Sequence, residues 1–275
     1  MKKHLSAGAA LTVVAAAAVS FPALAGHGWN NYHWSRTGAA ITPPVGDNVD
    51  AKWDPYFQRV LDDWNRSDFI NSALAAGLTN PKNCKAVAGT IQVCNSKYGQ
   101  TGWLGIAQIW LSNGHITQGI TKLNDTYFDT AKYNTPAWRR MVFCQEVGHD
   151  YGLGHVNENF DDPNTGSCMD YTNDPARNDG QGTNEYTNQH DYDQLALIYG
   201  GHSEGTAGTT AVQSGQRSAG ISAEDSVGGD TPAQWGRAIH RDGYGRPDVF
   251  QLDLPGGGKK ITHVFWTLEH NRSGA

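Results

Sequence analysis

Residues 144–155 read Cys144-Gln-Glu-Val-Gly-His-Asp-Tyr-Gly-Leu-Gly-His155, and this stretch decides the fold that the rest of the chain is expected to adopt. Side chains four positions apart on a helix lie one above the other, so Gln145 and His149 can direct donor atoms at one point. Glu146 lies one position further along and reaches beside that point. The spacing is typical of a helix that holds a metal ion.

A turn after this helix brings a further donor to the same point. Gly152 can end the helix by taking a left-handed backbone conformation, and His155 then returns toward His149. Neutral imidazole is a good zinc donor, whereas the amide oxygen of Gln145 is a poorer one. The spacing therefore predicts one zinc ion held by His149 and His155, with Gln145 as a weak third ligand and the Glu146 carboxylate beside the metal-bound water.

A second motif follows at Ser167-Cys-Met-Asp-Tyr171, with Met169 fourteen residues after His155. The two motifs together resemble those of the metzincin clan of zinc metallopeptidases, and within it the matrixin-like branch, whose pattern is HExxHxxGxxH followed by a methionine turn. The chain departs from this pattern at Gln145, which stands in place of the first histidine. The resemblance extends from about Trp53 to Tyr199, and its motifs are specific between Gln145 and Tyr171.

The resemblance implies an α+β fold, in which a twisted mixed sheet carries an active-site helix, a methionine turn and a closing helix. It also implies a metal-dependent endopeptidase, with Glu146 as general base and then proton donor to the leaving amine. Met169 would lie beneath the metal, and Tyr171 would stabilise the oxyanion. The strand Trp103–Leu111 would be the sheet edge that pairs with an extended peptide or protein substrate.

The glutamine leaves an alternative function open. A catalytically inactive protein of the same fold would bind peptide or protein in the groove, with weak metal binding or none. Water or Tyr171 could also fill the place that Gln145 leaves. A working site is favoured because a decayed site has no reason to keep the base, and the chain retains Glu146, His149, His155, Met169 and Tyr171.

The first 25 residues have the pattern of a signal peptide, with Lys2 and Lys3 before the apolar run Leu11–Val19 and the small-residue site Ala23-Leu-Ala25. The run is too short for a membrane anchor. Removal of both lysines changes the formal net charge from −6 to −8, which argues against nucleic acid or an anionic membrane as partner. We expect a secreted protein, extracellular or periplasmic, and no pattern indicates its oligomeric state.

The four cysteines of an exported chain predict two disulfides. Cys84 and Cys94 flank a strand-like segment, and Cys144 and Cys168 each precede a motif residue. The pairing 84–94 with 144–168 is favoured among the three connectivities that four cysteines allow, and buried free thiols are the alternative for each pair.

The remainder divides into a metzincin-like catalytic domain (26–200), a flexible linker (201–234) rich in small and polar residues, and a C-terminal β-hairpin extension (235–275). Helices are expected to begin at Asp54-Pro55, with Asp54 as N-cap, and at Thr135-Pro136. Asn113-Gly114 predicts a tight hairpin turn. Further predicted elements are a closing helix over Asp191–Tyr199 and terminal strands over Val249–Leu254 and Ile261–Leu268.

Two further sets of residues have weaker signals. A calcium site would use the loop carboxylates, because hard oxygen ligands suit that ion, but their spacing is not that of an EF-hand and a solvated loop is favoured. The spare histidines are interpreted as surface or packing residues. The carboxylates are Asp161, Asp162, Asp170, Asp174 and Asp179, and the histidines are His115, His190 and His202.

Overall fold

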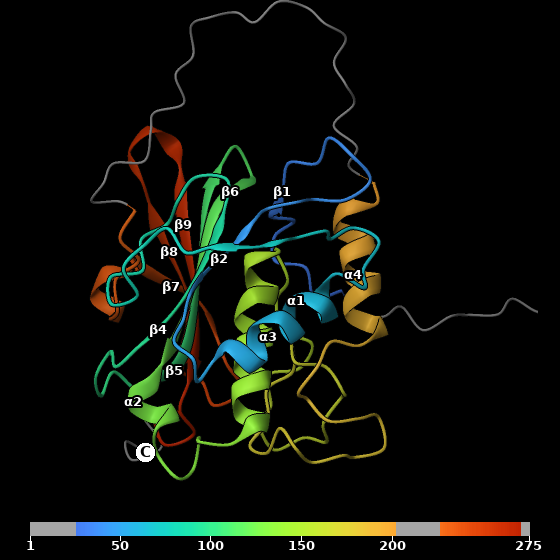
Figure 1. Ribbon diagram of the computed structural model, residues 1–275, viewed down its shortest axis with the longest axis vertical. Coiled ribbons are helices and arrows are strands. Elements are labelled where there is room, and N and C mark those ends of the chain that lie inside the picture. Colours follow the sequence, from blue (N-terminus) through green and yellow to red (C-terminus); the bar gives the residue numbers. More distant parts are fainter. Residues whose placement is uncertain (1–25, 202–225, 271–275) are drawn as a thin grey trace, which may run out of the picture.

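The computed structural model describes residues 26–201 and 226–270 as a mixed α/β fold with one large sheet and four α-helices (Figure 1). The predicted signal peptide (1–25) lies outside the described residues, as do positions 202–225 of the predicted linker. Among the described residues, no helix is long and apolar enough to cross a membrane.

Nine strands form the sheet, in the order β3-β2-β4-β6-β5-β9-β8-β7, with the short β1 also paired with β6. The pairs on the β3 side of β6 are parallel, and β5, β9, β8 and β7 follow in antiparallel pairs. The strands are β1 (His33–Trp34), β2 (Val45–Asn48), β3 (Leu74–Ala76), β4 (Ile91–Ser96), β5 (Trp103–Ser112), β6 (His115–Asn124), β7 (Arg237–Arg241), β8 (Pro247–Asp253) and β9 (Lys259–Trp266).

Both predicted hairpins are present. Asn113 and Gly114 turn the chain between β5 and β6 with positive φ angles of 51° and 84°. In the C-terminal hairpin, β8 pairs with β9 after a short 3₁₀ segment, Pro255–Gly257. The sequence did not indicate β7, which adds a third strand to this extension.

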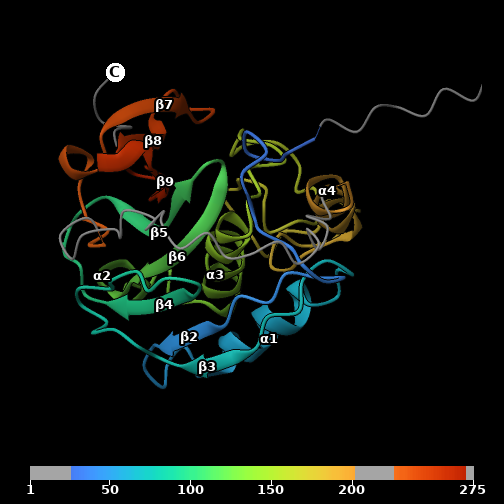
Figure 2. The same cartoon turned by 90° about the horizontal axis from the view of Figure 1, so that it is seen from above.

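The expectation that β5 is a free edge for substrate is wrong. The strand β9 pairs with β5 in antiparallel register from Trp103, opposite Trp266, to Leu111, opposite Lys259. Viewed from above, the C-terminal strands continue the sheet beyond β5 (Figure 2). The main-chain groups that an extended peptide would need are therefore already bonded to the protein's own tail.

The helices α1 (Asp54–Trp64) and α3 (Pro136–Asp150) pack together and lie on one face of the sheet, while α4 (Gln189–Tyr199) lies to the side (Figure 1). The Thr135 hydroxyl caps α3 by accepting a hydrogen bond from the Trp138 amide, 3.3 Å away. In α1, Trp53 holds the N-cap position and Asp54 begins the first turn, which corrects the predicted cap. A fourth helix, α2 (Asp125–Phe128), is one turn long.

Two disulfides, Cys84–Cys94 and Cys144–Cys168, join the predicted pairs. The second ties α3 to the segment that contains Met169. Disulfides persist in oxidising compartments, so they agree with a location outside the cytoplasm.

Residues 226–234, at the end of the predicted linker, contact the other face of the sheet. The Gln108 side-chain amide donates to the Gly228 carbonyl (2.6 Å), and buried Lys122 pairs with Asp230 (2.7 Å). A short 3₁₀ segment, Pro232–Gln234, then leads into β7. These contacts bring the chain from the linker to the edge where the C-terminal strands begin.

Candidate metal centre

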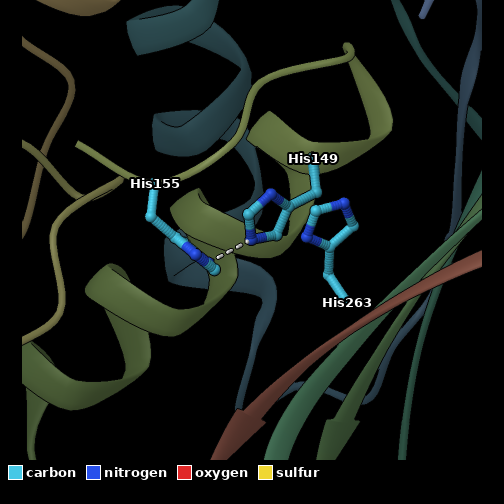
Figure 3. A group of neighbouring side chains, drawn as sticks. All are labelled: His149, His155 and His263. Carbon is cyan, nitrogen blue, oxygen red and sulfur yellow. Dashed lines mark hydrogen bonds between the residues drawn. The ribbon is translucent and has the colours of Figure 1, made fainter. Parts of the chain in front are cut away.

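Three histidines from separate parts of the chain converge beside α3 (Figure 3). His149 comes from the last turn of α3, His155 from the loop after it, and His263 from β9. The Nε2 atoms of His149 and His155 are 3.0 Å apart, and the rings of His149 and His263 stack with centroids 4.0 Å apart. One ring nitrogen from each residue lies within 4.8 Å of the other two, so the three residues form a group that could hold a metal ion.

The turn that returns His155 to the helix depends on Gly152. Its φ is 94°, and a side chain there would collide with the carbonyl oxygen of Tyr32. The Leu153 amide then donates back to the Gly148 carbonyl at 3.2 Å, which closes the helix end. Glycine is the residue that takes this conformation without steric cost, so the sequence prediction of a glycine-ended helix is confirmed.

Hydrogen bonds orient two of the rings for ligation. The Nδ1–H of His149 donates to the Leu153 carbonyl (2.8 Å), and Nδ1 of His155 lies 3.2 Å from a carboxylate oxygen of Glu158. Hydrogen bonds at Nδ1 orient metal-binding histidines in the same way. The Nε2 atoms of the two rings face each other at 3.0 Å, a hydrogen bond marked by the dashed line in Figure 3. Both ring nitrogens of His263 are buried and have no hydrogen-bond partner among the described residues.

The surroundings of His149 and His263 favour the neutral form of both rings. Burial lowers the pKa of His149 well below its ordinary value, and the neighbouring His263 and His155 lower it further. Burial also lowers the pKa of His263 well below its ordinary value. Neutral imidazole is the form that binds metal, since its lone pair is not occupied by a proton.

Glu146 precedes His149 by three positions on α3, so the two side chains are neighbours on the helix surface. Its carboxylate is buried against β5, where Gly105 leaves the space that it occupies, because a Cβ there would lie 2.6 Å from Oε1. Burial raises the pKa of Glu146 well above its ordinary range, and the nearby Asp150 raises it further, whereas the Ala107 backbone amide, which faces the carboxylate, lowers it.

The side chain of Gln145 bonds to the methionine turn. Its Nε2 donates to the Cys168 carbonyl (2.8 Å), and its Oε1 is buried without a hydrogen-bond partner. The residue that accompanies His149 and His155 in the histidine group is His263, which the sequence analysis did not identify. A signal was present, because His263 alternates with the apolar Ile261 and Phe265 in the predicted strand, and a histidine is unusual on such an apolar face.

Met169 and Tyr171 lie close to this group. The sulfur of Met169 lies against Gly148 of α3, next to His149 in the chain; its position beneath a metal stays a prediction. The ring of Tyr171 lies 4.1 Å from that of His155, and its hydroxyl donates to Asp248 on β8 (3.1 Å). The Tyr171 hydroxyl is therefore engaged by the C-terminal extension.

The loop carboxylates proposed for calcium are bonded to donors of the loop itself. Asp179 accepts from the Asn164 amide and from Arg177, both at 2.7 Å, and Asp170 accepts from Asn184 at 2.7 Å. Within the described ranges, the groups of three or more potential ligands contain none of the five aspartates. Of the spare histidines, His190 belongs to a second such group, and His202 lies outside the described residues.

Neither protein-family models nor curated proteins give a match to this chain. Fold and site therefore define its class: a disulfide-bonded mixed α/β protein with a buried group of three histidines at the junction of a helix, a turn and a C-terminal strand.

Proposed function

We propose that this chain is a secreted, zinc-dependent peptidase related in architecture to the metzincins, with His149, His155 and His263 as the zinc ligands. The observation that carries the proposal is the approach of His263 to the two motif histidines. In a tetrahedral site with Zn–N bonds of about 2.0 Å, ligand nitrogens lie about 3.3 Å apart. The 3.0 Å between the Nε2 atoms of His149 and His155 is close to that spacing.

The donor set fits zinc in its chemistry as well. Three neutral imidazoles are a known catalytic ligand set, and such sites keep one coordination position for water. Among the described residues, neither buried ring nitrogen of His263 has a hydrogen-bond partner that would compete with a metal. When bound, zinc supplies Lewis acidity and a water of lowered pKa.

The protein's own groups then have defined roles. Glu146 would accept the proton of the attacking water and pass it to the leaving amine, since it lies beside His149 on α3. The ring of Tyr171 packs against that of His155, and its hydroxyl must leave Asp248 to stabilise an oxyanion. A peptide substrate does not pair with β5, because β9 occupies that edge.

A second candidate is a protein that binds the metal and performs no hydrolysis. It is favoured by the burial of the site: Glu146, His149 and His263 are 0%, 1% and 2% exposed. In this case zinc would have a structural role and join the C-terminal extension to α3.

The two candidates are separated by measuring zinc content and hydrolysis of a quenched-fluorescent peptide library on the same samples. We expect Glu146→Gln to keep the zinc of the wild type and lower kcat by about 10²–10⁴-fold. Glu269→Gln, an exposed site 58% accessible in its side chain, is the matched control and should match the wild type. Equal rates in wild type and Glu146→Gln would contradict the proposal, and a fully zinc-loaded wild type without activity would select the second candidate.

A further inference from the structure

A second group of potential ligands lies at the start of α4. His27 belongs to the first described segment of the chain, and His190 and Asp191 stand in the first turn of the helix. One ligand atom from each lies within 4.8 Å of the other two. The Nε2 atom of His27 is 3.6 Å from Oδ1 of Asp191, and the rings of His27 and His190 stack with centroids 4.8 Å apart.

The atoms that face this point lack partners. The side chain of His27 is 2% exposed, and its Nδ1–H donates to the Gly154 carbonyl at 3.2 Å. This contact leaves the Nε2 lone pair of His27 directed at the group, where it has no hydrogen-bond partner within residues 26–201 and 226–270. The Nδ1 atom of His190 is likewise buried and has no partner in these ranges.

The third member of the group, Asp191, is fully buried. Its Oδ1 lies 3.6 Å from Nε2 of His27, the ion-pair contact of this carboxylate within the described part of the chain. The Ser167 hydroxyl and the Asn188 amide each donate to the carboxylate, which orients its oxygens.

We propose that His27, His190 and Asp191 bind a second zinc ion, separate from the histidine centre beside α3. Two imidazole nitrogens and one carboxylate oxygen are a zinc ligand set, and the 3.6 Å between His27 and Asp191 is near the ligand separation of a tetrahedral site. His190 is only partly buried, so water can occupy the fourth position.

The proposed ion joins two segments that are 163 positions or more apart in the chain, and its position suggests a structural role. The His27 carbonyl accepts from the Gly154 amide (2.5 Å), and the Trp29 amide donates to the Gly152 carbonyl (3.1 Å). The segment thus runs along the turn that leads to His155, and the Trp29 ring packs edge-on against His263 at 5.1 Å. A zinc ion that fixes His27 to α4 would therefore also hold the Trp29 ring against His263, at the first site.

The test is the zinc content of purified, zinc-loaded protein after gel filtration. We expect two zinc ions per chain in the wild type, one in His190→Gln, one in His263→Ala and none in the double variant. Asp193→Asn, an exposed position on the same helix, is the control and should keep two. His190→Gln is preferred to Asp191→Asn because the Asp191 side chain also caps α4.

A single zinc in the wild type that persists in His190→Gln would overturn the proposal, as would two zinc ions in that variant. Failure of the first site has a different signature: one zinc in the wild type that persists in His263→Ala and is lost in His190→Gln. Amide hydrogen exchange gives a readout other than stoichiometry. Zinc should slow amide exchange over residues 27–32 in the wild type and in His263→Ala. Exchange rates that are the same with and without zinc in both proteins would contradict the structural role assigned to the second ion.

Discussion

The two ends of the Gln145 amide have different surroundings, and the difference matters for its role. The nitrogen bonds the Cys168 carbonyl, whereas the oxygen is buried without a partner. The amide thus connects α3 to the methionine turn at the position where the metzincin pattern has a ligand. In the proposed ligand set, His263 supplies the imidazole that position 145 lacks.

This assignment predicts that Gln145→Ala keeps its zinc. Removing the amide leaves the buried Cys168 carbonyl without its donor, so the free energy of unfolding should fall by about 1–3 kcal/mol. Urea denaturation and zinc content measured on the same preparation check both parts. Loss of zinc with unchanged stability would show instead that Gln145 is a ligand.

Single residues also show what the sequence could and could not predict. The spacing of Gln145, Glu146, His149 and His155 was sufficient to predict the ligand helix and its turn, because these relations are local. His263 could not be placed, because its approach depends on how β9 docks more than 100 positions away from the motif. Pairing between distant strands follows from tertiary packing, which local patterns do not encode.

Among the elements, β9 has alternate side chains on the two faces of the sheet, and each face packs against a different part of the protein. Ile261 and Phe265 face the main core, together with α3, and Val264 and Trp266 face a second apolar cluster on the other side. The period of two places His263 on the same face as Ile261 and Phe265, toward His149. The sequence predicted this hairpin, but not that it would cover β5 rather than leave it open to a substrate.

The Cys144–Cys168 disulfide joins α3 to the methionine turn and closes a loop of 24 positions. Replacing both cysteines by serine should lower the free energy of unfolding by about 3 kcal/mol, because the unfolded chain gains entropy. Urea denaturation of the double variant and of the wild type measures this difference in the free energy of unfolding. A change below about 0.5 kcal/mol would mean that the unfolded state retains the loop.

The pairing of β7 with β8 contains a pH-dependent contact. His240 on β7 donates to Asp248 on β8 (2.8 Å), and this hydrogen bond raises the pKa of His240. Because the folded-state pKa is raised, the stabilisation is fully present below about pH 6.5 and is lost as pH rises through the folded-state value.

We therefore expect the melting temperature of His240→Gln, measured with a chelator present, to fall below that of the wild type by more at pH 5.5 than at pH 8.5. An equal difference at both pH values would exclude a contribution from the charged pair. The chelator removes the separate pH dependence of metal binding.

On the scale of the whole molecule, three distant segments meet at the histidine centre: the segment that contains Trp29, the α3 helix with its turn, and β9. Three of the four α-helices, both disulfides and the terminal hairpin were predictable from capping residues, cysteine positions and alternation, whereas the one-turn helix α2 was not. The order of the strands was not, because it depends on long-range pairs. A ligand bound across such segments stabilises the folded state as a unit.

Zinc should therefore raise the global stability of the protein. At a free zinc concentration 100 times the dissociation constant, one site contributes about 2.7 kcal/mol to the free energy of unfolding. The melting temperature of the wild type should rise on zinc addition, and His263→Ala should show a smaller rise. An identical rise in both proteins would mean that zinc binds without His263.

The central claim is that a strand of the C-terminal extension completes the metal site of the motif helix. Anomalous diffraction at the zinc edge, from crystals of the zinc-loaded protein, tests it most directly. The account predicts a peak about 2.0–2.1 Å from Nε2 of His149, Nε2 of His155 and a ring nitrogen of His263. A peak bound to the amide oxygen of Gln145 and remote from His263, or no peak at these residues, would contradict it.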